Sequence, residues 1–85
     1  MADENGIEIG KITHFFDKIS VAVVELTDNV KVGDKIRIKG ATTDFEQPIK
    51  EMQIEHEKVA KAGSGDAIGL KVKDRVRIHD KVYLI

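Results

Sequence analysis

Apolar residues alternate with polar ones over short stretches of this chain, as they do in β-strands that bury one face. In KIRIK, residues 35–39, the two isoleucines share one face and the three basic residues share the other. Further strands with β-branched apolar positions are predicted at 7–15, 19–26, 49–56, 67–72 and 81–84. No stretch of helix length keeps a 3.6-residue apolar period. The pattern predicts an all-β protein of six or seven strands.

Two predicted strands contain a break in their alternation. The breaks fall between Ile9 and Ile12 and between Ile49 and Met52. An extra residue in one strand of a pair produces such a phase change and bends the strand. We therefore expect β-bulges at both places, in strands that curve around a barrel.

Three turns share one form, in which an aspartate precedes a strand: VGDKIRI at 32–38, SGDAIGL at 64–70 and IHDKVYL at 78–84. Gly33 and Gly65 can supply a positive φ, and Asp34 and Asp66 can accept hydrogen bonds from backbone amides. In the third turn His79 stands in place of the glycine. Histidine tolerates left-handed conformations better than most residues, so tolerance is favoured over a functional role for His79.

Length and composition limit the chain to one small domain. With 85 residues there is room for one modest core. The acidic start MADENG lacks the basic and apolar parts of a secretory signal, and there is no cysteine. No apolar run approaches the roughly 18 residues of a membrane span. We expect a flexible N-terminus at 1–6 and a single β-barrel domain at 7–85, located in the cytoplasm.

Specific motifs resemble a known family over nearly the whole chain, from Gly6 to Leu84. The strand ending in KVGDKIRIKG, the segment IKEMQIEHEKVAKAGSGDAIGLKV and a last strand after HD are similar to the second domain of translation elongation factor Tu and its archaeal and eukaryotic relatives. Gly33, Gly65 and Gly69 stand where that family has glycines, which makes them structural turn positions. The resemblance implies a small closed six-stranded antiparallel Greek-key barrel, here without the GTPase that precedes it.

A second resemblance is carried by FFDKISVAVVEL, residues 15–26. This segment is similar to the C-terminal barrel of collagenase-like peptidase-family proteins. The chain also departs from the elongation factors, where the barrel helps to hold the aminoacylated end of transfer RNA. Gln53 stands where they carry a glutamate that meets the terminal adenosine, and Lys71 stands where an apolar residue lines that pocket. No GxxxxGK[ST] loop is present, so GTP hydrolysis is excluded.

Basic residues repeat at every second position in two segments. The net charge is −1, yet residues 35–39 and 67–85 each carry +3. The first row holds Lys35, Arg37 and Lys39, and the second holds Lys71, Lys73, Arg75 and Arg77. A solvated face is one explanation; RNA contact with stacking on Phe45, Tyr83 or His56 is the other. The candidate RNA- or partner-binding residues are Lys35, Arg37, Lys39, Gln53, His56, Lys71 and Lys73.

The segment KISVAVVEL, residues 18–26, is apolar on both faces. Ile19, Val21 and Val23 oppose Ala22, Val24 and Leu26. A barrel can bury only one of these faces in its own interior. A covering partner, a dimer or burial under Phe15 and Phe16 are the three ways to avoid an exposed apolar surface.

Catalytic and metal-binding motifs are missing from the sequence. The three histidines lie far apart and lack the spacing of metal ligands, and there is no nucleophile elbow. We expect no enzyme activity, metal or cofactor. The leading hypothesis is a non-catalytic, translation-factor-like module, monomeric or weakly dimeric, that contacts RNA, the ribosome or a translation-related partner. The alternative is an accessory module that docks on an enzyme such as a peptidase-family protein.

Overall fold

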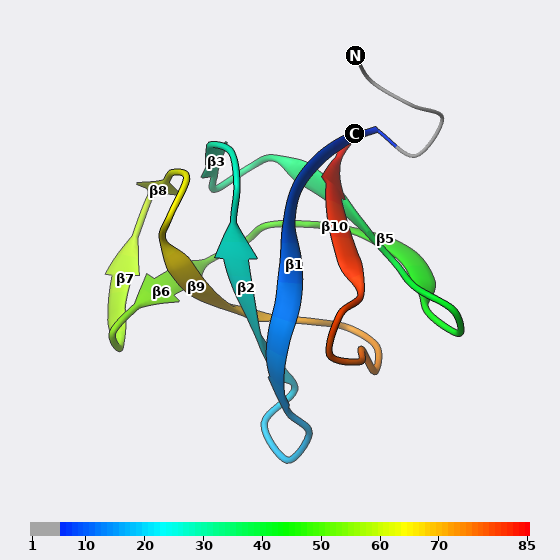
Figure 1. The fold of residues 1–85 in the computed structure, drawn as a ribbon. Coiled ribbons are helices and arrows are strands. Elements are labelled where there is room, and N and C mark those ends of the chain that lie inside the picture. Colours follow the sequence, from blue (N-terminus) through cyan, green and yellow to red (C-terminus); the bar gives the residue numbers. More distant parts are fainter. Residues whose placement is uncertain (1–5) are drawn as a thin grey trace.

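A computed structural model describes residues 6–85, which form ten β-strands (Figure 1). The strands are β1 (Ile7–Phe16), β2 (Val21–Leu26), β3 (Val30–Lys31), β4 (Lys35–Lys39), β5 (Asp44–Pro48), β6 (Met52–Ile54), β7 (Glu57–Val59), β8 (Lys61–Ala62), β9 (Ala67–Lys71) and β10 (Lys81–Leu84). The all-β prediction is confirmed. No helix among residues 6–85 is long and apolar enough to cross a membrane. Residues 1–5 of the predicted flexible N-terminus lie outside the described part of the chain.

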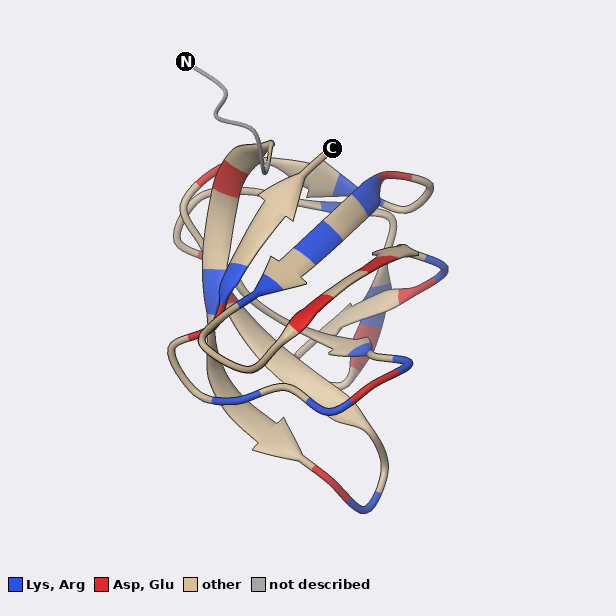
Figure 2. Ribbon diagram, turned by 90° about the vertical axis from the view of Figure 1, so that its right-hand side faces the viewer, with Lys and Arg blue, Asp and Glu red and all other residues tan. Residues whose placement is uncertain are grey.

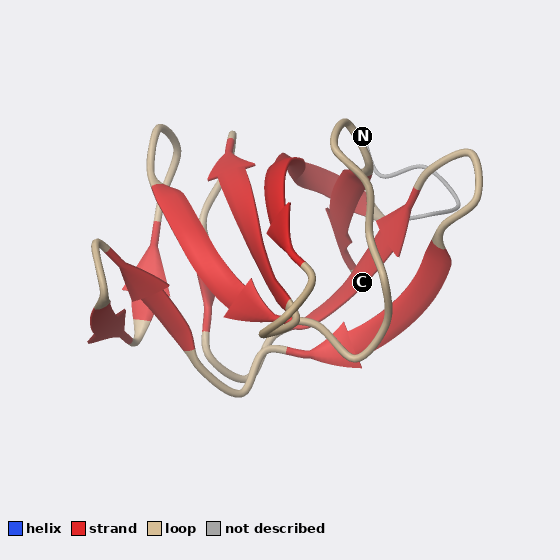
Figure 3. Ribbon diagram, turned by 90° about the horizontal axis from the view of Figure 1, so that it is seen from below, coloured by secondary structure: helices blue, strands red, loops and turns tan. Residues whose placement is uncertain are grey.

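Eight strands form one antiparallel sheet in the order β5-β4-β10-β1-β2-β9-β6-β7, while β3 and β8 pair separately. The sheet curls into a half-barrel, so the expected closed, six-stranded barrel is wrong (Figure 3). Its edge strands, β5 and β7, are not hydrogen-bonded to each other. Both edges are polar in sequence, DFEQP and EKV, and show no apolar period that would have revealed them. Pro48 suits an edge strand because it has no amide proton to donate.

The core lies on the inner face of the curled sheet. Ile36 and Ile38 are fully buried there, as the pattern of residues 35–39 predicts. Ala22, Val24 and Leu26 form the buried face of β2. The other buried apolar residues are Ile9, Ile12, Val30, Ile49, Met52, Ile68, Leu70, Val72, Val76 and Val82. The inner face is thus filled by mostly β-branched side chains from nearly every part of the sheet.

The predicted bulge between Ile9 and Ile12 is confirmed. Glu8 pairs with Tyr83 and Gly10 with Val82, so the pairing with β10 shifts at Ile9. This shift lets Ile9 and Ile12 both face the core although they are three residues apart.

The second predicted bulge is wrong, because residues 49–51 connect two strands instead of belonging to one. Ile49 is held against the first aspartate turn. Its amide donates to the Asp34 carbonyl and its carbonyl accepts from the Gly33 amide, each at 2.8 Å. The phase change between Ile49 and Met52 therefore marks the passage from β5 to β6.

Two strand boundaries also differ from the prediction because residues with positive φ end the strands. The expected strand at 49–56 stops at Ile54, and Glu55 and His56 have φ values of 51° and 68°. A two-residue loop with positive φ at both positions joins antiparallel strands with the correct twist. The expected strand at 19–26 begins only at Val21, after Ser20 with a φ of 55°.

Candidate interaction surfaces

The three aspartate turns have the same hydrogen bonds. The carboxylates of Asp34, Asp66 and Asp80 each accept a bond from the backbone amide three residues earlier, at 3.0, 2.9 and 2.9 Å. The amide of each aspartate donates back to the carbonyl of that same earlier residue, at 3.1, 3.0 and 3.1 Å. In the first turn the Lys31 ammonium also donates to Asp34 at 2.8 Å, and this bond lowers the pKa of the Asp34 carboxyl.

The residue before each aspartate has a positive φ: 99° at Gly33, 92° at Gly65 and 80° at His79. A Cβ added to Gly33 or Gly65 would meet no atom within 4 Å. The requirement for glycine there is therefore one of backbone conformation and not of space. Gly69, expected in a turn, lies instead within β9, where an added Cβ would stand 3.6 Å from Val21 Cγ1.

The basic row on β4 faces carboxylates on β5. Arg37 Nε lies 2.8 Å from Asp44 Oδ1, and its Nη2 donates to Asp44 Oδ2 at 2.9 Å. This bidentate bond lowers the pKa of Asp44. Lys35 Nζ lies 3.4 Å from Glu46, and Lys39 pairs in register with Asp44. Basic and acidic positions are interspersed on the ribbon accordingly (Figure 2), so much of this positive charge is compensated within the protein.

The seven candidate binding residues are separated into three groups. Lys35, Arg37 and Lys39 lie on β4, whereas Gln53 lies on β6 and His56 in the turn that follows it. These strands stand near opposite edges of the sheet. Lys71 and Lys73 form the third group, at the seam between the end of β9 and β5. The structure does not assemble one binding site from all seven residues.

Gln47, on β5, forms side-chain hydrogen bonds across this seam. The sequence pattern did not single it out. Its Nε2 donates to the Lys71 carbonyl at 2.8 Å and its Oε1 accepts from the Lys73 amide at 2.9 Å. Lys73 also places its ammonium 5.8 Å from the centre of the Phe45 ring. A glutamine inside the polar run DFEQP carries no sequence signal of burial, which is why it was missed.

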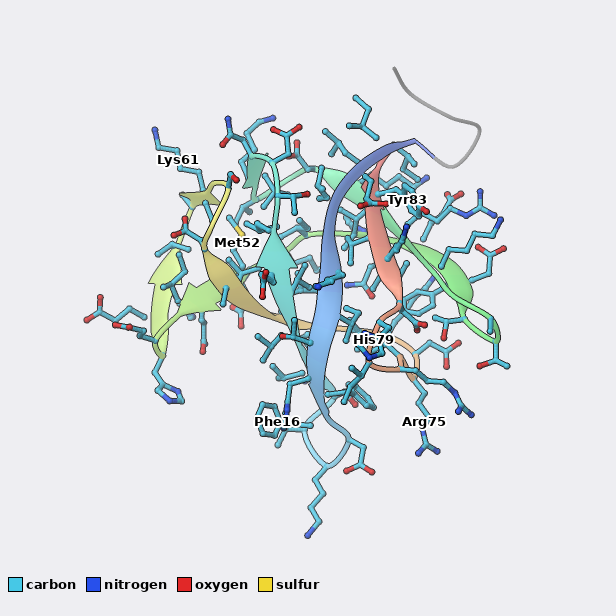
Figure 4. The ribbon with its side chains drawn as sticks, viewed as in Figure 1. Phe16, Met52, Lys61, Arg75, His79 and Tyr83 are labelled. Atoms are coloured by element: carbon cyan, nitrogen blue, oxygen red, sulfur yellow. The ribbon has the colours of Figure 1, made fainter. Side chains whose placement is uncertain are left out.

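Arg75 and Arg77, predicted on an outward strand face, lie instead in the exposed connection between β9 and β10. This connection passes beside the β1–β2 hairpin, where Arg75 and Asp17 line one shallow hollow. Phe16 and Arg75 accordingly lie toward the same end of the molecule (Figure 4).

An apolar outer face lies on β1, β2 and the turn that joins them, formed by Phe16, Ile19, Val21 and Val23. Phe16 pairs with Val21 across the hairpin. Phe16 is 47% exposed and Ile19 60% exposed, while the two valines are half-buried. Figure 4 shows Phe16 beside the hairpin, away from the core.

The molecule covers this outer face only in part. The His14 ring lies 4.5 Å from the Phe16 ring, and Phe15 turns to the other side, against the core. Of the three ways of covering the face, burial under Phe15 and Phe16 is therefore incomplete. Among residues 6–85, no group of three His, Asp or Glu side chains is placed to hold a metal ion.

No protein-family model matches the chain. It is 45% identical over 80 residues to an uncharacterized protease of Methanocaldococcus jannaschii, an alignment that covers 93% of this chain and 20% of that protein. It is 36% identical over 84 residues to a collagenase of Porphyromonas gingivalis, covering 96% of this chain and 20% of the collagenase. The chain thus spans about a fifth of the length of these curated relatives.

Two crystal structures of the C-terminal domain of a Geobacillus thermoleovorans protein described as a U32 peptidase have the same fold. Their TM-scores are 0.86 and 0.87, at 18% and 16% sequence identity. The alignments cover 89% and 100% of this chain, and 96% and 98% of the solved domains. At such low identity these structures establish the fold alone.

The chain is therefore similar to part of proteins named as proteases and collagenases, and not to translation factors. The prediction of an elongation-factor-like, RNA-binding role in protein biosynthesis is wrong. The similarity to the peptidase group, carried by FFDKISVAVVEL, is supported. The glycine–aspartate turns led to the wrong functional prediction because they specify the turn geometry of a small curled sheet. They carry no information about what that sheet binds.

Proposed function

We propose that this chain is a non-catalytic accessory module of a peptidase-family protein, and that its apolar outer face packs against the catalytic part of that protein. The proposal rests on the exposed apolar side chains of Phe16 and Ile19 and on the greater length of the related proteins. These relatives are about five times longer than the segment that matches this chain.

The energetics favour a covered outer face. Burying one large apolar side chain contributes roughly 1.5–3 kcal/mol, so Phe16 and Ile19 together offer a substantial part of a modest interface. The half-buried Val21 and Val23 extend this surface along β2, with Lys71 of β9 beside Val21. Exposed apolar patches of this kind mark interaction sites more often than isolated surface residues do.

A module also needs its own core, and this chain has one. The inner face of the sheet is closed by residues from β1 to β10, and its buried side-chain polar atoms within residues 6–85 all have hydrogen-bond partners. The Geobacillus relative of the fold was crystallised as a separate C-terminal domain, which accords with independent folding.

The docking surface is tested with matched variants. The chain would be titrated with the Methanocaldococcus protease from which the segment matching this chain has been deleted, and binding followed by fluorescence anisotropy. Phe16→Ser and Ile19→Ser should each weaken binding by about tenfold or more, the scale of a buried apolar anchor. Ile7→Ser is the control, because Ile7 lies on the same strand as Phe16 and is 46% exposed, at the opposite end of β1.

The pattern of losses decides the outcome. Equal effects of Phe16→Ser and Ile7→Ser would show that the outer face is not the contact. Self-association of the chain through Phe16 and Ile19, in place of binding to the protease, would assign the surface to a dimer and contradict the proposal.

A further inference from the structure

A hollow lies at the seam where Gln47 of β5 reaches the end of β9. It has a volume of about 480 Å³ and lies between the end of β5 and the end of β9. Pro48 is the exposed apolar side chain of its lining, and the core residues Ile49, Leu70 and Val72, each only 2–3% exposed, lie beneath. Its volume falls within the roughly 300–1,000 Å³ of common small-ligand sites.

The rim of this hollow is basic. Lys50, Lys71 and Lys73 line it, and within residues 6–85 none of their ammonium groups forms an ion pair. Glu51 is the carboxylate that lines the hollow, and it lies 3.5 Å from Lys58. The three lysines therefore present positive charge that this part of the protein does not compensate.

The backbone at the seam is already satisfied. Gln47 occupies the Lys71 carbonyl and the Lys73 amide, and β9 already pairs with β2 and β6. These two bonds fix Gln47 of β5 against the end of β9 beside the hollow. The hollow differs from the β4 row, where carboxylates stand beside the basic residues.

We propose that the seam hollow binds a carboxylate joined to an apolar group, as in the C-terminal residue of a peptide. The apolar group would lie against Pro48, above Ile49 and Leu70, and the carboxylate would receive charge-assisted hydrogen bonds from the lysines. The geometry distinguishes this ligand from a phosphate polyanion, which would leave the apolar walls uncovered. The site adjoins the outer face, because Lys71 pairs with Val21, but its other lining residues lie on β5, β9 and the segments that follow them.

Three probes test the site by nuclear magnetic resonance titration of the 15N-labelled chain. They are N-acetyl-Leu-Leu as the free acid, its C-terminal amide, and octanoate. The free acid should bind at millimolar concentration and shift the amide signals of residues 47–51 and 70–73. The amide should bind at least about tenfold more weakly, since it lacks the charge that the lysines recognise. Octanoate tests whether the site accepts a carboxylate that is not part of a peptide. Binding of either acid at these residues supports the site. The acid that binds more tightly shows whether a peptide C-terminus or a fatty-acid-like carboxylate is the preferred ligand.

Charge variants provide the second arm. The double variant Lys71→Gln/Lys73→Gln should lose most of the affinity for the free acid, whereas Lys35→Gln, on the β4 row, should retain it. The double variant leaves the apolar lining residues Pro48, Ile49, Leu70 and Val72 unchanged. Because the replaced lysines are exposed, the spectrum of the variant away from the seam should match that of the wild type. Equal binding of acid and amide, shifts outside the seam, or full affinity in the double variant would overturn the proposal.

Discussion

The side-chain oxygen of Gln47 accepts a hydrogen bond from the backbone amide of Lys73 at 2.9 Å, across the seam between β5 and the end of β9. The Gln47 amide group also donates to the Lys71 carbonyl. One side chain thus occupies both backbone groups that a neighbouring strand would otherwise pair. The half-barrel is held at this point by a glutamine instead of a ladder.

Replacing Gln47 should therefore destabilise the fold. Gln47→Leu leaves the Lys71 carbonyl and the Lys73 amide without their partner, and each unsatisfied buried group costs about 1–3 kcal/mol. We expect a loss near the lower half of that range for the pair, because water can reach an edge. Urea unfolding measures it, with Gln53→Leu on β6 as the control. Equal unfolding midpoints for wild type and Gln47→Leu would show that the seam bonds contribute nothing.

His79 should be replaceable by glycine with a gain in stability. Its φ of 80° costs an L-residue roughly 1–2 kcal/mol, and the extra freedom of unfolded glycine returns part of this. His79→Gly should raise the free energy of unfolding by about 0.5–1 kcal/mol. If stability is unchanged or lower, the His79 side chain makes a compensating interaction in the folded state.

The matched test is to add a Cβ at Gly65. Gly65→Ala should lower stability by about 1–2 kcal/mol although nothing lies within 4 Å, because the φ of 92° alone is unfavourable for alanine. Gly69→Ala, on strand β9, is the control and should have little effect. A similar loss at both glycines would indicate that conformation at the turn is not the cause.

Acid should weaken the first turn. The hydrogen bond from the Lys31 ammonium lowers the pKa of Asp34 in the folded protein. A lowered folded pKa contributes stability above the unfolded pKa, about 3.9, and that stability is lost as the pH falls through the folded value. In Asp34→Asn the side-chain oxygen can still accept the hydrogen bond from the Lys31 amide, but the negative charge is lost. The free energy of unfolding of this variant should therefore fall less steeply below about pH 4 than that of the wild type. Asp17→Asn is the control, and parallel pH profiles for wild type and Asp34→Asn would contradict this account.

Sequence reasoning located the parts of the fold that bury apolar residues at regular intervals. Residues 35–39, which alternate cleanly, and residues 81–84 form strands with the predicted bounds. The edges could not be found in this way. Asp44–Pro48 and Glu57–Val59 are polar, and their pairing depends on β4 and β6 more than on their own composition.

The candidate site was harder to predict because charge and pairing are properties of neighbours. The row Lys35, Arg37 and Lys39 looks basic in sequence, but Asp44 and Glu46 arrive beside it only when β5 pairs with β4. The apolar outer face was visible earlier, since no single barrel can bury both sides of residues 19–26. What the sequence could not show is that Phe15 and Phe16 diverge, one to the core and one to solvent.

The most direct test of the docking account is sedimentation velocity of the chain mixed with the Methanocaldococcus protease lacking its matching segment. We expect a faster-sedimenting complex with one copy of each, formed at micromolar concentration, because interfaces between domains of one protein are modest when the domains are supplied separately. Independent sedimentation of the two components at the highest attainable concentration would contradict the assignment of this chain as an accessory module of a peptidase-family protein.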